Sequence, residues 1–325
     1  MHGTAAAPPT VDTRRPGARW NAMGPTGGAV IALVVLVAVN AMFTPNFATV
    51  GNFWNVLYQL SVTLLVGVGM TFVIATGGID LSVGSVMAVA AAVAAVTLDQ
   101  GFLVAVPAAL AAALAVGLLN GAFVAYTRVQ PIVVTLATLL AGRGLAQVIN
   151  RGGALITIED PAFLALGRGL VGPVPMQVLI AAAVVALAAF VLRTTPFGRY
   201  VLAAGGNPAA ARLAGVPVTR TVVTVYVVSA GLAGLAGLIE AARLGASAAA
   251  KIGQNVELDA IAAVVVGGTL LAGGRATILG TVVGALIMQV IATSFNMLLV
   301  PYAWSLAFKA LIIVVAVYLQ RPKRV

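Results

Sequence analysis

The sequence predicts an all-α, polytopic membrane protein with about ten transmembrane helices, some of them broken. Of its 325 residues, 61% are hydrophobic and 8% are charged. A soluble globular domain has about 25% charged residues, so a chain of this composition could not cover its apolar surface in water. At ~20 residues per span, the apolar residues suffice for roughly ten spans.

Ten apolar runs of suitable length follow one another along the chain. The predicted spans are 28–44, 56–75, 81–98, 102–126, 131–150, 174–192, 221–241, 257–272, 276–298 and 302–320. Residues 1–26 contain Ala, Pro, Gly and Arg without a hydrophobic period and are expected to form a disordered tail. Residues 27–320 are then one transmembrane domain, and 321–325 a short basic C-terminus.

The basic residues predict the orientation, because cytoplasmic loops carry an excess of Lys and Arg. Ten spans put both termini on one side. With that side in the cytoplasm, the inner regions hold Arg14, Arg15, Arg19, Arg128, Arg193, Arg199, Arg212, Arg220, Arg275, Arg321, Lys323 and Arg324, and the outer regions hold Arg151, Arg168, Arg243 and Lys251. Because the net charge of +10 is spread over tail and loops rather than gathered on one face, it does not indicate a nucleic-acid partner.

The loop at 193–220 differs from its apolar surroundings and contains the signals of a short helix. Asn207 can cap its N-terminus and Pro208 fits the first helical position. Gly215 can adopt the left-handed C-terminal conformation, and Pro217 prevents continuation. Such a short helix is marginal alone in water, so it needs a docking surface. Either it is an ordinary cytoplasmic loop or it is a coupling helix that contacts a separate, energy-supplying subunit.

Two glycine doublets, Gly77-Gly78 and Gly267-Gly268, interrupt apolar runs and are followed by new helical segments. They predict broken helices of the kind that line cavities in transporters. Asp80 follows the first doublet and can accept backbone N–H groups at the start of the next helix, or it can face a conduction path.

Other polar residues fall inside the predicted spans. Arg143, Gln147 and Asn150 have helical spacing, and with Asn120 they could form a polar stripe along a path or hydrogen-bond between helices. Glu240 and Arg243 are three residues apart and are expected to pair.

Several residue types are missing, which limits the chemistry. The chain has no cysteine, and His2 is its one histidine, so thiolate and histidine metal sites and catalysis by these residues are excluded, and no metal site is expected. The three lysines follow Ala250, Phe308 and Pro322, so no Gly-Lys pair of a phosphate-binding loop exists. If transport is driven by ATP, the ATP and Mg²⁺ are bound by another polypeptide, and this chain is not an enzyme.

Three strings in order, ATGGIDLSVGS (75–85), FGRYVLAAGGNPAAARLAGV (197–216) and VELDAIAAVVVGGTLLAGGRATILGTVVGALIM (256–288), resemble the permease subunits of bacterial ATP-binding-cassette sugar importers. The resemblance covers about residues 28–320 and is to the ribose, xylose and galactofuranose type, in the wider group that includes branched-chain amino-acid permeases. The stretch 256–274 looks most similar to the galactofuranose type. One departure is Ala276, where many members have glycine.

This resemblance implies a bacterial inner-membrane permease of type II-like importer architecture, with no cofactor of its own. It implies two cytoplasmic ATPase subunits, a second permease copy or paralogue, an external sugar-binding protein and surrounding lipid. It places the ATPase contact on Arg199, Gly205, Gly206, Asn207, Ala211, Arg212 and Gly215. The candidate translocation and gating residues are Gly77, Gly78, Asp80, Asn120, Arg143, Gln147, Gly267 and Gly268.

Three alternatives remain. An ion-coupled secondary transporter would have intramembrane acids placed to bind H⁺ or Na⁺, a passive pore would need no basic loop with a capped helix, and an importer of this type could carry branched-chain amino acids instead of a sugar.

Overall fold

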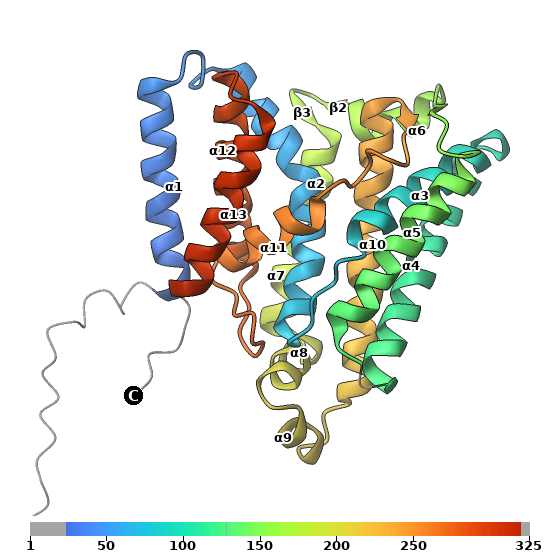
Figure 1. Ribbon diagram of the computed structural model, residues 1–325, viewed down its shortest axis with the longest axis vertical. Helices are drawn as coiled ribbons and strands as arrows, with labels where there is room; N and C mark the ends of the chain where they lie inside the picture. Colours follow the sequence, from blue (N-terminus) through green and yellow to red (C-terminus); the bar gives the residue numbers. More distant parts are fainter. Residues whose placement is uncertain (1–23, 128, 320–325) are drawn as a thin grey trace, which may run out of the picture.

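A computed structural model describes residues 24–127 and 129–319, and most of these residues are helical (Figure 1). The first half of the chain forms α1 (Gly24–Phe43), α2 (Val50–Ala75), α3 (Val83–Thr97), α4 (Phe102–Thr127) and α5 (Pro131–Ile149). A 3-10 turn (Leu98–Gln100) follows α3. The second half forms α7 (Met176–Thr194), α10 (Val218–Leu244), α11 (Val256–Val266), α12 (Ile278–Met297) and α13 (Tyr302–Leu319).

Shorter elements lie at the two ends of this bundle (Figure 1). One end holds α6 (Pro161–Arg168) and two small antiparallel ladders, β1 (Ile156–Thr157) with β4 (Ala246–Ser247) and β2 (Leu170–Val171) with β3 (Val174–Pro175). The opposite end holds α8 (Pro196–Gly206) and α9 (Pro208–Leu213). We call these the α6 end and the α9 end.

Each of the ten predicted spans contains one helix, which confirms the predicted class. Among the described residues, eight helices are long and apolar enough to cross a membrane, and α13 contributes a shorter apolar stretch, Ala303–Val315. The run at 257–272 is different, because α11 has 11 residues and rises only about 16 Å, roughly half of the ~30 Å hydrocarbon core. Residues 1–23 of the expected N-terminal tail lie outside the described residues, and the last three residues of that tail, 24–26, belong to α1. Arg128 and residues 320–325, which include the expected basic C-terminus, also lie outside the described residues.

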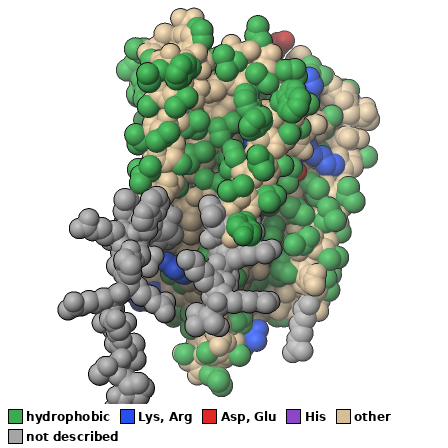
Figure 2. Space-filling view, turned by 60° about the vertical axis from the view of Figure 1, so that its left-hand side comes forward, with side chains coloured by type: hydrophobic (Ala, Val, Ile, Leu, Met, Phe, Trp, Pro, Cys, Tyr) green, Lys and Arg blue, Asp and Glu red, His purple; other side chains and the backbone are tan. Residues whose placement is uncertain are grey.

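The membrane helices are arranged with α2, α3 and α10 at the centre and α1, α4, α5 and α7 around them. Most of α2 is buried in the protein, whereas α1 and α5 expose most of their apolar side chains. Figure 2 shows one face of the molecule, on which hydrophobic side chains predominate and charged ones are few. Such a surface is stable in lipid rather than in water.

Small residues allow the central helices to approach one another. A Cβ added to Gly234 would lie 2.6 Å from the Ala113 Cβ, and one added to Gly237 would meet the Met87 backbone. Gly284 faces the Ala263 backbone and Gly280 faces Gly267 in the same way. These glycines therefore let the helix backbones pack closely.

The two predicted helix breaks are confirmed, and the structure adds a third irregular segment. Gly77 and Gly268 have positive φ angles of 82° and 93°, directly after α2 and α11. Residues 76–82 connect α2 to α3, and residues 245–255 connect α10 to α11. Both short helices, α3 and α11, are thus preceded by a non-helical stretch that lies among the other helices.

The two halves repeat one order of elements in opposite directions. In each half, a long helix is followed by an irregular segment, a short helix and an antiparallel helix pair: α2, 76–82, α3, α4 and α5, then α10, 245–255, α11, α12 and α13. The helix α2 ends at the α9 end, where Gly274 N donates to Ala75 O, whereas α10 ends at the α6 end, where Ile158 N donates to Gly245 O. Inverted repeats of this kind occur in transporters, with the substrate site between them.

Candidate functional sites: the α8–α9 segment and the meeting point of the broken helices

The short helix predicted between Asn207 and Gly215 is present as α9. The Asn207 side-chain oxygen accepts hydrogen bonds from Ala209 N (3.1 Å) and Ala210 N (3.0 Å), and Pro208 occupies the first position. Gly215 follows with φ of 80°. The predicted cap and stop are therefore confirmed. Local sequence determines this helix, since each signal acts within three residues of the group it satisfies.

The surface of α9 is open to a partner. Ala211 is buried against the rest of the chain, whereas Arg212 is exposed and Leu213 is 92% exposed. Arg193, Arg199 and Arg220 are exposed on neighbouring turns. Covering the Leu213 side chain with another protein would remove apolar surface from water, which is favourable.

The adjoining helix α8 is fixed to the membrane helices at Gly205. A Cβ there would lie 2.7 Å from Gly274 N and 2.9 Å from the Ala75 carbonyl carbon, so only glycine fits. The same two partners are joined by the hydrogen bond from Gly274 N to Ala75 O (2.9 Å). A displacement of α8 therefore acts directly on the end of α2 and on the turn before α12, next to the breaks at Gly77 and Gly268.

The N-termini of α3 and α11 meet in the interior. A Cβ on Gly84, in the first turn of α3, would contact the Gly253 carbonyl oxygen and would lie 2.7 Å from Glu257 Oε2, in the first turn of α11. Two short helices from the two halves thus point their N-termini toward one place. In transporters with broken helices, this arrangement marks the substrate region.

Arg143 holds the 245–255 segment in this position. Its guanidinium donates to the carbonyl oxygens of Ala249 (3.1 Å), Ile252 (2.6 Å) and Gly253 (2.6 Å). Further along, at the end of α5, Asn150 Nδ2 donates to Ser247 O and Ser247 Oγ at 3.0 Å each. The planar guanidinium presents its N–H donors in a fixed fork, whereas the donors of a lysine ammonium are crowded on one nitrogen at the end of a flexible stem.

The predicted polar stripe on α5 is only partly formed, since Gln147 is exposed on the outside of α5 while Arg143 and Asn150 face the 245–255 segment. The expected pairing of Glu240 with Arg243 is wrong. Glu240 Oε2 instead accepts from Gly253 N (3.1 Å), and the Arg243 guanidinium lies 5.6 Å from the centroid of the Tyr58 ring. The described residues contain one ion pair with a nitrogen–oxygen distance below 4 Å, between Lys309 Nζ and Asp259 Oδ1 (2.7 Å).

Asp80 holds the other irregular segment. Its carboxylate is 1% exposed and accepts from Ser82 N (3.0 Å), Ser82 Oγ (2.6 Å) and Ser229 Oγ (3.1 Å). Asp80 thus accepts from one backbone N–H, that of Ser82 just before α3, but it does not cap α3 itself, whose N-cap residue is Ser82. The bond to Ser229 ties the 76–82 segment to α10.

Asn120 extends this network, because its Nδ2 donates to Ser82 Oγ (2.9 Å) and its Oδ1 accepts from Thr138 Oγ1 (2.6 Å). Sequence reasoning missed Ser82, Thr138 and Ser229. Small hydroxyl residues are common in apolar helices, and only their spatial partner distinguishes these from the others. A metal-ligand group of three or more acidic or histidine side chains is absent from residues 24–127 and 129–319.

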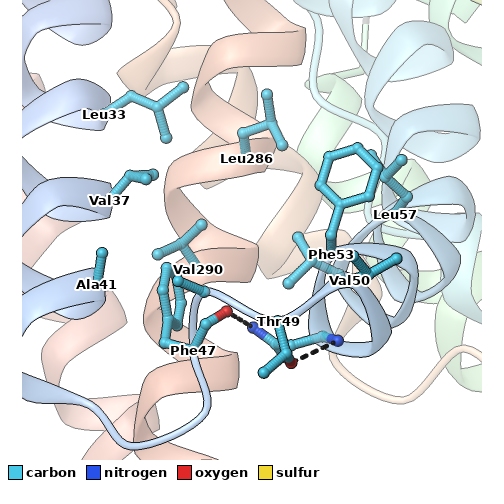
Figure 3. A pocket seen from close by; sticks show the side chains of 13 residues that line it. Leu33, Val37, Ala41, Phe47, Thr49, Val50, Phe53, Leu57, Leu286 and Val290 are labelled. Carbon is cyan, nitrogen blue, oxygen red and sulfur yellow. Dashed lines mark hydrogen bonds between the residues drawn. The ribbon is translucent and has the colours of Figure 1, made fainter.

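An apolar cavity of about 480 Å³ lies between α1, α2 and α12 (Figure 3). Its wall includes Leu33, Val37, Leu57, Leu286 and Val290, and the hydrogen-bonded Thr49 turn lies at one edge. A site for a polar solute needs polar groups on its wall, so this cavity belongs to the lipid-facing side of the bundle.

Broken helices from two inverted halves, joined at one end to an exposed helical segment, define a multi-pass membrane transport protein. The chain belongs to the family described as "Branched-chain amino acid transport system / permease component", whose model matches residues 52–317. It is therefore a non-catalytic permease subunit.

Curated relatives match almost the full length of the chain. The ribose import permease of Escherichia coli (strain K12) is 44% identical over 91% of this chain and 94% of its own length. The ribose import permease of Haemophilus influenzae is 42% identical over 88% and 90%. The galactofuranose transporter permease of Escherichia coli (strain K12) is 37% identical over 94% of this chain and 91% of its own length. Over the whole chain, these two ribose permeases are therefore more similar to it than the galactofuranose permease is. No solved structure matches the chain significantly.

Proposed function

We propose that this chain is the membrane subunit of an ATP-driven importer for a monosaccharide, with a pentose such as ribose as the first candidate. The names of its relatives, which import ribose, galactofuranose, fructose and L-arabinose, support the substrate class. Branched-chain amino acids remain the second candidate, because the family description carries that name.

The observation that carries the mechanism is the path from α9 to the broken helices. The helix is exposed, α8 connects it to Ala75 and Gly274, and both of these residues adjoin a helix break. A cytoplasmic ATPase that moved the exposed helix would therefore move the breaks. ATP and Mg²⁺ are bound by that partner, consistent with the missing phosphate-binding loop.

The coupling contact comprises Arg199, Gly205, Gly206, Asn207, Ala211, Arg212 and Gly215. The gating residues are the doublets Gly77-Gly78 and Gly267-Gly268, with Asp80, Asn120 and Arg143 holding the irregular segments that move. Gln147, exposed on α5, faces lipid or a second copy of the permease.

The protein lies in a bacterial inner membrane, with the α9 end and both chain termini on the cytoplasmic side. Twelve of the sixteen basic residues of the tail and loops fall on that side, as expected for cytoplasmic regions. An external binding protein delivers the sugar at the α6 end, and a second permease completes the pathway.

This function is tested by reconstituting the permease with its ATPase and binding protein in vesicles and measuring uptake of radiolabelled D-ribose. We expect uptake that requires ATP and survives an ionophore. Uptake that an ionophore abolishes and ATP does not support would establish a secondary transporter. Uptake of L-leucine in place of ribose would establish the amino-acid alternative.

The variant Asn207→Ala/Gly206→Pro tests the coupling role of α9. Losing the cap costs about 1 kcal/mol, and the proline introduced beside it restricts the preceding backbone, so α9 loses its fixed position. We expect ATP-dependent uptake to fall severalfold. Thr49→Ala is the matched control: Thr49 caps α2 at the α6 end through Asn52 N, so it loses a similar bond far from the coupling segment. Equal uptake by wild type and the Asn207 variant would remove the coupling role.

A further inference from the structure

A second cavity, about 140 Å³ in volume, lies toward the α6 end of the bundle between α2, α10 and α12. Its floor is formed by Gly253 and by Val256 at the start of α11. We call it the polar pocket, because six polar side chains from these helices and from the 245–255 segment line it: Gln59, Thr63, Glu240, Arg243, Gln254 and Gln289. At ~30 Å³ per water molecule, its volume corresponds to about five waters, which limits the pocket to a small solute.

The polar pocket offers both donors and acceptors. Gln289 Nε2 donates to Gln59 Oε1 and to Thr293 Oγ1 at 3.2 Å each, which leaves the Gln289 carbonyl oxygen as an acceptor. Arg243 carries five N–H donors on a guanidinium that stacks on the Tyr58 ring. Glu240 accepts from Gly253 N with one carboxylate oxygen, and the other oxygen remains as an acceptor.

The polar pocket is also connected to the meeting point of the broken helices. Gly253 forms part of its wall, and the Gly253 carbonyl oxygen accepts from Arg143 on the other side of the same backbone. Val256 begins α11, whose first turn contacts Gly84 of α3 through Glu257. A solute in the polar pocket therefore lies directly beside the segment that has to move when the broken helices rearrange.

We infer that the polar pocket is a transient binding site for a monosaccharide between the α6 end and the meeting point of the broken helices, an inference that rests on the proposed function. A sugar ring presents several hydroxyl groups, each both donor and acceptor, and the lining side chains supply both kinds of partner at a pocket of that size. A branched-chain amino acid needs an apolar wall for its side chain, and the pocket offers only Val62 and Val256. The chemistry therefore favours a polyhydroxy solute.

The chain has no cysteine, so a single introduced thiol reports occupancy of the polar pocket directly. We would introduce Thr63→Cys in the full permease and follow its reaction with a small thiol reagent. D-ribose at about 100 mM, far above a millimolar Kd, should slow this reaction by several fold. Asn296→Cys, exposed on the same side of the bundle on α12, is the control and should react at one rate with or without ribose. An unchanged rate at Thr63→Cys, or equal protection by L-leucine, would overturn the assignment.

Transport by Gln59→Leu and Gln289→Leu supplies a second readout. Each substitution removes hydrogen-bonding atoms with little change in volume, and we expect uptake of D-ribose in reconstituted vesicles to fall about three- to tenfold. ATP hydrolysis stimulated by the binding protein and the melting temperature should stay at wild-type values, with Asn296→Leu as the control variant. Wild-type uptake tests the proposed function by itself. If wild type imports ribose and both glutamine variants do so at the same rate, only the polar pocket assignment fails.

Discussion

Arg143→Leu is expected to destabilise the permease strongly. The guanidinium satisfies the carbonyls of Ala249, Ile252 and Gly253, and these lie in an irregular segment with no helical partner for them. Hydrogen bonds to a charged group are worth about 1.5–3 kcal/mol each, and they are not additive. Arg143 is half-buried, and its removal leaves three carbonyls of the segment without a donor, so we expect a loss of about 3 kcal/mol.

The measurement is thermal unfolding of purified protein in detergent. A loss of this size should lower the melting temperature by roughly 5 °C or more. Arg143→Lys keeps the charge but cannot donate in three fixed directions, so it should fall between leucine and wild type. Gln147→Leu, one turn along α5 and exposed, should melt like wild type. If Arg143→Leu melted with the wild type, the guanidinium would not hold the 245–255 segment.

Gly205→Val is expected to have the largest effect on coupling. The added Cβ would lie 2.7 Å from Gly274 N and 2.9 Å from the Ala75 carbonyl carbon, both backbone atoms that cannot rotate away. The helix α8 must then move off the end of α2. Overpacking of this kind costs about 1–3 kcal/mol, and 1.4 kcal/mol changes a rate about tenfold, so we expect ATP-dependent uptake to fall by a factor of roughly 5 to 140.

The neighbouring glycine gives the matched comparison. A Cβ on Gly206 would meet only Gly274 Cα at 3.8 Å, an ordinary contact, so Gly206→Ala should retain most of the uptake. Both variants are measured in vesicles alongside ATP hydrolysis, which should continue in Gly205→Val because the ATPase is a separate chain. Equal uptake by the two variants would mean that the close contact of α8 with α2 transmits no movement.

The features that could be predicted from the sequence are those that depend on residues close together in the chain. The cap at Asn207, the stop at Gly215 and the breaks after Gly77 and Gly267 each depend on residues a few positions apart, and all are present. The apolar run at 257–272 was harder to interpret, because hydrophobicity continues past Val266 while the helix does not.

The partners of the buried polar groups could not be predicted, because they are distant in sequence. Arg143 bonds to residues 106 to 110 positions away, and Asp80 reaches Ser229 across 149 positions. For Glu240 and Arg243, helical spacing predicted a contact that the structure does not contain. Their spacing permits a pair on one helix face, but a backbone N–H of the 245–255 segment provides Glu240 with a closer partner.

The central claim is that α9 faces the cytoplasm and is where a separate ATPase acts on the permease. Ala210→Cys in this cysteine-free chain tests it, because Ala210 is exposed on α9. A membrane-impermeant thiol reagent should leave this residue unmodified in intact cells and should label it in inside-out vesicles, where added ATPase subunit should protect it. Labelling of Ala210→Cys from outside intact cells would contradict the account.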